Sequence, residues 1–305
     1  MPTTTIESPW RRPPDGQPLL LSVDFEDWHQ LVGRRLGLGD WDRPGPACPR
    51  QTETLLDLLD EVGVRATFFV LGMAARAHPD LPARIAERGH EIACHGDGHV
   101  PVHSQSPQEF ARDLRRARAT IEELTGRVPV GYRAPAFSIT HDSLWAHEVL
   151  VQEGFLYDSS QHDSPRIRGR VRDARPGPHP IELPQGTLWE FPVAVWPTPA
   201  GPVPVGGASY WALLPTPLIL RGLDRAEPLA ALYLHPQELD PQPVHVELPA
   251  GAPARQRVLG AFRSAQRNLA RRRAPNVLRA IARAHPLISY GEAHAQLADR
   301  APARP

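Results

Sequence analysis

Apolar runs and amphipathic stretches alternate along the first two thirds of the chain. Residues 18–25 (PLLLSVDF) form an unbroken apolar run, which is typical of a strand buried on both faces of a parallel sheet. Residues 51–63 instead place leucines at helical spacing and end at Gly63, as an amphipathic helix does. The pattern predicts strands over residues 18–25, 64–72, 91–96, 128–135, 154–160, 187–197 and 228–236, and helices over residues 51–63, 78–90, 106–126 and 141–154.

This alternation also predicts the fold class, α/β. Parallel strands need long crossover connections, and helices usually supply them. Strand and helix alternate over about 230 residues, a length that favours a barrel over an open sheet. No glycine-rich phosphate loop follows the first strand, which argues against a nucleotide-binding fold.

The last part of the chain has a different character. Residues 255–298 have a helical pattern and are rich in arginine, and we interpret them as solvated helices that pack on the barrel. A binding tail is the alternative interpretation of the same stretch. Many of the 36 prolines gather in residues 165–205 and 236–254, where they predict loops rather than helices.

Composition narrows the function classes. Lys and Arg together number 34, as do Asp and Glu, so the zero net charge gives no general attraction to nucleic acid or to an anionic membrane. All 34 basic residues are arginines, so no lysine can form a Schiff base. Two cysteines, Cys48 and Cys94, argue against a disulfide framework and fit a reducing compartment. No long apolar run and no apolar leader occur, so we expect a soluble cytoplasmic protein with no transmembrane segment.

Polar residues follow several predicted strands at the point where each strand ends. The first strand leads into Asp24, Glu26 and Asp27, and carboxylates in such a place are usually paired, bound to a metal or used in chemistry. Later strand ends carry His95, His99, His103, Arg133, Asp158 and His235. Because reactive groups in parallel α/β folds gather at the carboxyl ends of strands, we expect these side chains to share one site.

Two histidines four residues apart predict a site for a divalent metal. His95 leaves its strand directly and His99 follows one turn later, whereas His103 lies beyond a proline in the loop. Together with one carboxylate, two histidines leave coordination positions open for a water and a substrate carbonyl. Zn²⁺ is the metal we expect, and Co, Ni and Fe remain alternatives.

The carboxylate ligand is either Glu26 or Asp27. Strand alternation places Asp24 and Glu26 on one face, so that this pair supplies base and ligand. If the strand ends at Phe25, Asp27 can turn inward and serve as the ligand instead. We favour Glu26 narrowly and keep both as candidates.

Hydrolysis at such a metal needs groups that move protons. A carboxylate free of the metal can take the proton of the water, and His235 is the obvious donor to a leaving amine. Arg133 either anchors a loop or orients the base carboxylate through a bidentate pair. Asp158 is either a turn residue or a functional one.

The motifs SVDFED, HGDGH, YRAP, YDSS and LYLHP, in this order and spacing, carry a resemblance. The chain resembles the polysaccharide deacetylases of carbohydrate esterase family four, most of all the branch associated with exosortase-type exopolysaccharide loci. The resemblance implies a distorted (β/α)7 barrel of the polysaccharide deacetylase type over residues 18–240. A disordered segment, residues 1–17, precedes the barrel, and a C-terminal helical extension, residues 241–305, packs on it.

The resemblance also implies an activity and its residues. Members hydrolyse the N-acetyl group of N-acetylhexosamine residues with the help of a divalent metal, so the expected substrate is an N-acetylated glycan or an exopolysaccharide intermediate. It implies Asp24 as catalytic base, Arg133 as the arginine that orients it and His235 as catalytic acid. Asp158 lies in the motif associated with holding that acid. The metal histidines are His95 and His99.

Two departures from the family pattern stand out. The family has adjacent aspartates, base then ligand, in its first motif, whereas here Asp24 precedes Phe25, Glu26 and Asp27. An aromatic residue usually follows the arginine motif, and its backbone N–H helps to stabilise the oxyanion; this chain has Ala136 there.

Two other functions remain open. A hydrolase of a small cyclic amide is one, because some relatives of the barrel act on such substrates. A carbohydrate-binding protein that has lost turnover is the other. For a cytoplasmic enzyme, a lipid-linked or nucleotide-linked sugar is the expected substrate, and exopolysaccharide machinery is a possible partner.

Overall fold

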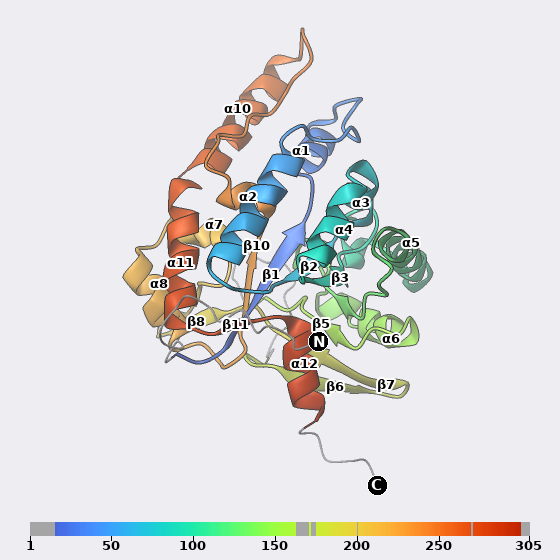
Figure 1. The fold of residues 1–305 in the computed structure, drawn as a ribbon. Helices are drawn as coiled ribbons and strands as arrows, with labels where there is room; N and C mark the ends of the chain where they lie inside the picture. Colours follow the sequence, from blue (N-terminus) through green and yellow to red (C-terminus); the bar gives the residue numbers. More distant parts are fainter. Residues whose placement is uncertain (1–15, 163–170, 172–174, 200, 270, 300–305) are drawn as a thin grey trace, which may run out of the picture.

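A computed structural model describes residues 16–162, 171, 175–199, 201–269 and 271–299 (Figure 1). The strands are β1 Leu19–Phe25, β2 Thr67–Val70, β3 Glu91–Cys94, β4 Gly131–Tyr132, β5 Tyr157–Asp158, β6 His179–Leu183, β7 Gly186–Glu190, β8 Val195–Thr198, β9 Gly201–Pro204, β10 Ala231–Leu234 and β11 Leu287–Ile288. The α-helices are α1 Trp28–Leu36, α2 Cys48–Glu61, α3 Gly72–Ala77, α4 Asp80–Glu87, α5 Pro107–Thr125, α6 Trp145–Gln152, α7 Ala208–Trp211, α8 Thr216–Leu223, α9 Pro236–Leu239, α10 Ala254–Asn268, α11 Ala274–Ala284 and α12 Tyr290–Ala298. Of the N-terminal segment predicted to be disordered, all but the last two residues lie outside the described part.

Parallel strands form the centre of the molecule, as the pattern predicted. In the order β10-β1-β2-β3-β4-β5-β7 each strand pairs in parallel with the next, and β6 adds an antiparallel edge to β7. The chain beyond β7 then bonds to β10 at the other end of this row, where the Ala194 N–H donates to the Ala231 carbonyl at 2.8 Å. This contact curls the parallel sheet toward closure and confirms the distorted barrel.

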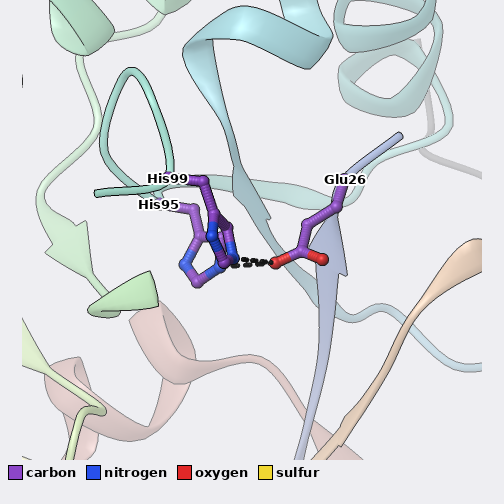
Figure 2. Close-up of side chains that lie close together, drawn as sticks. All are labelled: Glu26, His95 and His99. Atoms are coloured by element: carbon purple, nitrogen blue, oxygen red, sulfur yellow. Dashed lines mark hydrogen bonds and ion pairs between the residues drawn. The ribbon is translucent and has the colours of Figure 1, made fainter. Parts of the chain in front are cut away.

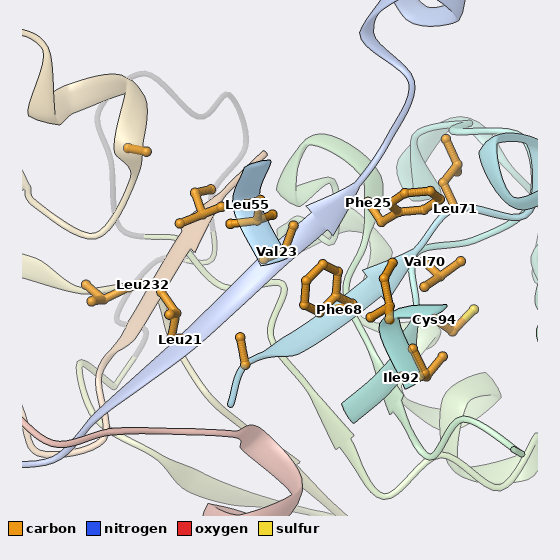
Figure 3. Packing of buried hydrophobic residues seen from close by; sticks show 14 of the residues in the cluster. Leu21, Val23, Phe25, Leu55, Phe68, Val70, Leu71, Ile92, Cys94 and Leu232 are labelled. Carbon is orange, nitrogen blue, oxygen red and sulfur yellow. The ribbon is translucent and has the colours of Figure 1, made fainter. Parts of the chain in front are cut away.

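The two faces of β1 serve different purposes. Leu21, Val23 and Phe25 pack outward among the helices in the main hydrophobic cluster (Figure 3). Leu20 faces the other way, into a smaller cluster inside the barrel. Because side chains alternate along a strand, Ser22 and Asp24 share the inner face with Leu20. The apolar run of the sequence is therefore a strand buried on both sides whose inner face becomes polar toward its carboxyl end.

Helix ends follow local sequence signals. Ser106 caps α5, accepting a hydrogen bond from the Glu109 N–H, while the Glu109 carboxylate accepts from the Ser106 N–H, and Gly126 ends the helix with a φ of 65°. Helix α1 was not predicted, although Asp27 caps it. The predicted strand 187–197 is divided between β7 and β8 around Pro192, which cannot donate a ladder hydrogen bond.

The C-terminal extension is largely helical, as predicted, but it does more than cover the barrel. After α10 and α11 the chain forms β11, which pairs in parallel with β1 at Leu19 and Leu20. Helix α12 then begins at Tyr290, whose side chain is fully buried among residues of the barrel interior. Among the described helices, none combines the length and apolarity that crossing a bilayer requires.

Candidate active site

The carboxyl ends of β1, β3, β4 and β10 bring most of the predicted residues to one cleft. The cleft has a volume of about 270 Å³, and its lining includes Asp24, Glu26, His99 and His235. Arg133 and His95 lie directly beneath it and are 0% and 1% exposed. Residues that are far apart in the sequence therefore meet as the barrel topology predicts.

Asp24 is held by the most densely bonded side chain of the site. Arg133 donates from Nη1 to Asp24 Oδ1 at 2.6 Å and to Ser22 Oγ at 2.7 Å. Its Nη2 donates to Ser159 Oγ at 2.8 Å and to the Tyr290 hydroxyl at 2.6 Å. Every one of these partners is buried, so the guanidinium is fixed in one orientation.

The surroundings keep Arg133 charged despite its burial. Its guanidinium carbon lies 4.2 Å from the centre of the Phe69 ring, which adds a cation–π contact. Burial alone lowers the pKa of Arg133, but Asp24 and the ring hydroxyl of Tyr290 raise that pKa above its ordinary value. Asp24 and Arg133 therefore form a buried ion pair in which both charges are compensated within the protein.

Glu26 meets both predicted histidines at a single oxygen (Figure 2). Glu26 Oε1 lies 3.0 Å from His95 Nε2 and 2.9 Å from His99 Nε2. Burial alone raises the pKa of Glu26, but His99, His95 and His235 together hold that pKa well below its ordinary value. The carboxylate is therefore ionised where the two rings converge.

The backbone sets the orientation of both rings. His95 Nδ1 lies 2.8 Å from the Arg133 carbonyl, which can only accept, so Nδ1 carries a proton and Nε2 faces Glu26. His99 has a φ of 52°, in the left-handed region that residues other than glycine rarely adopt. Arg34 of α1 donates to the Gly98 and His99 carbonyls and holds this loop.

The three ligand atoms fit a divalent cation. One oxygen of Glu26 and one nitrogen each of His95 and His99 lie within 4.8 Å of one another. His95, whose Nδ1 is protonated, points a lone pair at the carboxylate when the ring is neutral, so that contact needs either a second proton on the ring or a cation between the atoms. Two imidazoles and a carboxylate form a common zinc ligand set with positions left for water. Glu26, His95 and His99 would hold such an ion.

Asp27 does not reach this cluster. The strand does end at Phe25, but the chain then turns outward and Asp27 caps α1, accepting from the His29 N–H at 2.9 Å. Its other oxygen accepts from the Gly45 N–H at 2.6 Å and lies 2.8 Å from His78 Nε2. Asp27 thus holds loop and helix in place, and the geometry favours Glu26 as the ligand.

His235 lies at the end of β10, the strand that pairs with β1, and lines the same cleft. Its Nε2 lies 3.8 Å from Glu26 Oε2, and its Nδ1 lies 3.0 Å from Glu238 Oε2. Burial lowers the pKa of His235, but Glu238, Glu26 and Asp24 raise it, to a net value of about 9. Burial raises the pKa of Glu238, because the charged form of a carboxyl is its deprotonated form, but His235 and Arg267 bring that pKa down to about 2. This imidazolium is therefore paired with Glu238.

Asp158 is placed differently from what the resemblance implied. It does not contact His235; it lies on β5 beside Glu190 of β7, with Ser160 donating to its Oδ1 at 2.6 Å. Burial raises the pKa of Asp158 to about 6 and that of Glu190 well above its ordinary value, and Asp158 raises the latter further. Two neighbouring buried carboxyl groups do not ionise together easily, so Glu190 keeps its proton to a higher pH than Asp158 does.

Asp158 acts on the site through the loop that follows Arg133. Ser160, which donates to Asp158, also accepts from the Ala134 N–H at 2.8 Å. Two residues later Ala136 has a φ of 55° within the short 3₁₀-helix Pro135–Phe137 and lines the cleft. Asp158 therefore supports the backbone that presents Ala136 instead of orienting the acid.

Sequence reasoning missed several partners. Glu238 had a local signal, because HPQE places Pro at the first helical position and Glu at the third, where a capping box forms. Ser22, Ser159 and Tyr290 had none, because each reaches Arg133 only through the tertiary fold.

Comparisons with known proteins agree with the motifs. Residues 42–151 match the sequence model of the polysaccharide deacetylase family, and residues 159–273 match a domain of unknown function, DUF3473. The peptidoglycan deacetylase-like protein FGM2 of Gibberella zeae is 34% identical over 148 residues, 47% of this chain and 43% of that protein. The chitooligosaccharide deacetylase of Rhizobium leguminosarum bv. trifolii is 36% identical over 89 residues, 29% of this chain and 40% of that protein. The chain therefore spans less than half the length of these curated relatives.

One solved structure matches almost the whole chain. A protein of Mycobacterium smegmatis, provisionally described as a polysaccharide deacetylase, superposes with a TM-score of 0.59 at 22% identity and covers 96% of this chain and 98% of its own. That likeness concerns the fold. The family matches agree with the resemblance: residues 42–151 match the polysaccharide deacetylase family, and residues 159–273 match DUF3473.

Proposed function

We propose that this protein is a metal-dependent deacetylase that hydrolyses the N-acetyl group of N-acetylhexosamine residues in a glycan. The observation that carries the proposal is the cleft in which the Asp24–Arg133 pair, the Glu26–His95–His99 cluster and the His235–Glu238 pair meet. The names of the relatives support the same reaction class. The narrower setting, an exopolysaccharide intermediate, rests on the motif resemblance alone.

Asp24 is the group placed to take the proton of the attacking water. One of its oxygens accepts from Arg133, and the other accepts no hydrogen bond from the described residues, so it is available at the cleft. Arg133 is bonded on every side and cannot follow the carboxylate outward, so Asp24 keeps a fixed direction.

His235 is the group placed to protonate the leaving amine. It lines the cleft beside Glu26, 3.8 Å from Oε2 of that residue, and it is protonated before the reaction, since its pKa is raised to about 9, chiefly by Glu238 acting against burial. The proton that Asp24 takes up and the proton that His235 releases balance over a turnover.

The transition state develops negative charge on the former carbonyl oxygen. Ala136 lines the cleft on the loop held by Ser160, and we infer that its backbone N–H donates to that oxygen. A divalent metal held by Glu26, His95 and His99 would polarise the carbonyl and lower the pKa of a bound water.

Acetate release from chitin oligomers tests the proposal. Purified protein reconstituted with Zn²⁺ should release acetate, and removal of the metal with a chelator should abolish release until Zn²⁺, Co²⁺ or Ni²⁺ is restored. His99→Ala should bind less metal and be inactive, whereas His103→Ala, an exposed histidine outside the cleft, should behave as the wild type.

Three results would contradict the proposal or redirect it. Acetate release that survives complete metal removal would exclude the metal-dependent mechanism. Hydrolysis of a cyclic amide such as hydantoin, with none of any glycan, would favour the small-amide hydrolase. Glycan binding without turnover by metal-loaded protein would favour a non-catalytic carbohydrate-binding role.

A further inference from the structure

One wall of the cleft comes from two helices that are far apart in the sequence. Helices α1 and α10 lie side by side at one end of the molecule (Figure 1). The Gln256 side chain of α10 donates to the Leu36 carbonyl at the end of α1 at 2.9 Å. The arginine-rich stretch of the sequence thus begins at the cleft, and the catalytic groups described above do not account for its charge.

Three arginines of these helices line the cleft: Arg35 from α1, and Arg263 and Arg267 from α10. Arg267 lies 3.3 Å from Glu238 and is therefore balanced by a carboxylate. Arg263 has only a neutral acceptor, the Gln266 side-chain oxygen at 3.0 Å. Arg35 pairs with no carboxylate among the described residues, and neither does Arg263.

These two arginines differ from other unpaired arginines in where they lie. Some exposed arginines are paired, as Arg115 is with Glu153 and Arg279 is with Glu61. Others, such as Arg221 and Arg257, form no ion pair with a described carboxylate but lie outside the cleft. Inside the cleft the acids are already engaged, Asp24 by Arg133 and Glu238 by His235. A neutral glycan would leave Arg35 and Arg263 without a partner.

We propose that Arg35 and Arg263 form a subsite for a phosphate group on the substrate, so that the preferred substrate is an N-acetylhexosamine carrying a phosphate or diphosphate. This inference rests on the proposed deacetylase function. Two guanidinium groups match the double charge and the several oxygens of a phosphate better than they match a single carboxylate.

The phosphate can come from a nucleotide or from a lipid carrier. Both present a diphosphate next to the sugar, so the same two arginines serve either source. Comparing kcat/KM for a nucleotide-linked sugar with kcat/KM for a polyprenyl-linked sugar decides between the two sources. A higher kcat/KM for either of them than for a neutral substrate supports the subsite.

The test compares three substrates with metal-loaded full-length protein: UDP-N-acetylglucosamine, polyprenyl diphosphate N-acetylglucosamine in detergent micelles, and neutral diacetylchitobiose. The measured quantity is the ratio of kcat/KM for each phosphate-bearing substrate to kcat/KM for diacetylchitobiose. In the double variant Arg35→Gln and Arg263→Gln we expect this ratio to fall about tenfold or more, because charge-assisted hydrogen bonds are lost. Arg257→Gln, on the same helix but outside the cleft, should leave the ratio unchanged.

A direct binding measurement separates this inference from the proposed function. Calorimetry with inorganic pyrophosphate should show binding to the metal-loaded protein that weakens about tenfold or more in the double variant and not in Arg257→Gln. If the three proteins bind pyrophosphate equally, or if the double variant keeps the wild-type substrate ratio, the subsite is wrong. If no substrate yields acetate but pyrophosphate binding depends on both arginines, the deacetylase proposal fails and the anion site stands. Circular dichroism of each variant confirms that it is folded.

Discussion

Asp24 and Glu26 lie two residues apart on the same face of β1, yet the protein treats the two carboxylates differently. On the Asp24 side every charge is compensated by the protein: Arg133 is bonded to four side chains, and a cation–π contact adds to them. On the Glu26 side, one carboxylate oxygen lies 3.0 Å from a ring nitrogen of His95 and 2.9 Å from one of His99. The first arrangement is complete by itself, and the second offers ligand atoms that could hold a divalent cation.

The difference separates two tasks of one site. A base must keep its direction and its charge, which a buried guanidinium provides. A ligand must present a lone pair, and its neighbours must present theirs toward the same point. The strained backbone at His99, with a φ of 52°, belongs to the second task, because it turns that ring toward Glu26.

Replacing each carboxylate by its amide should have the largest effect and should separate the role of Asp24 from that of Glu26. Asp24→Asn removes the base, so kcat should fall by roughly 10²- to 10⁴-fold while metal content stays near that of the wild type. Glu26→Gln removes a ligand charge, so metal content should fall with activity. Metal analysis and acetate release on both variants check this. A loss of metal in Asp24→Asn together with full metal in Glu26→Gln would reverse the two roles.

Removing the guanidinium tests whether the Asp24 side is complete. Arg133→Met leaves Asp24 buried without its partner, so the free energy of unfolding should fall by about 3–5 kcal/mol. The double variant Arg133→Met with Asp24→Asn should recover part of that loss, because no unpaired charge remains. Urea unfolding of the wild type and of both variants gives the values. If Arg133→Met unfolds at the wild-type midpoint, the pair contributes nothing to stability.

Glu238 is expected to have a smaller effect, since it acts through His235. Glu238→Gln keeps the shape of the capping box but removes the charge that raises the pKa of His235. We expect kcat to fall by about 10- to 100-fold, in line with the loss of a residue that supports a site residue, with little change in KM. Ser209→Ala, which removes another partner of Glu238, is the matched control. A change confined to KM would point to substrate binding instead.

The Asp158–Glu190 pair shows a third way to bury a carboxyl group, which is to keep it protonated. Its replacement has the smallest expected effect, a shift in Tm. Burial raises both pKa values, so the folded state keeps a proton that the unfolded state releases as the pH rises above about 4. That contribution to stability is present at low pH and is lost as the pH rises through the folded pKa values. Glu190→Gln cannot lose a proton, so its Tm should exceed that of the wild type by an amount that grows from pH 4 to pH 8 and reaches a few degrees. A Tm difference that stays constant with pH would argue against the raised pKa of Glu190.

The sequence predicted the barrel well because its evidence is local. The apolar run of β1, the capping box of α5 and the histidine spacing in HGDGH each depend on neighbouring residues. Helix α1 was missed although Asp27 signalled its start, because the same residue was also a candidate ligand. The sequence allowed Asp27 to be either a helix cap or a metal ligand, and only the observed turn after Phe25 showed that it is the cap.

The sequence predicted which residues lie at the site, but it did not predict which side chains they pair with. Asp24, His95, His99, Arg133 and His235 meet because parallel strands end on one side of a sheet. Which acid pairs with which base depends on the tertiary fold: Asp158 was expected near His235 and lies instead beside Glu190. Glu238, three residues from the histidine, holds the place that the resemblance suggested for Asp158.

The position of Tyr290 has a consequence for how the protein is made. Strand β1 pairs with β10 and β11, and Arg133 completes its bonds only when Tyr290 of α12 is in place. During synthesis the ribosome must therefore release the chain through the start of α12 before Asp24 and its arginine are locked together. Contacts across such sequence distances slow folding. Until then, the nascent chain would carry Asp24 and Arg133 without the contacts that orient them.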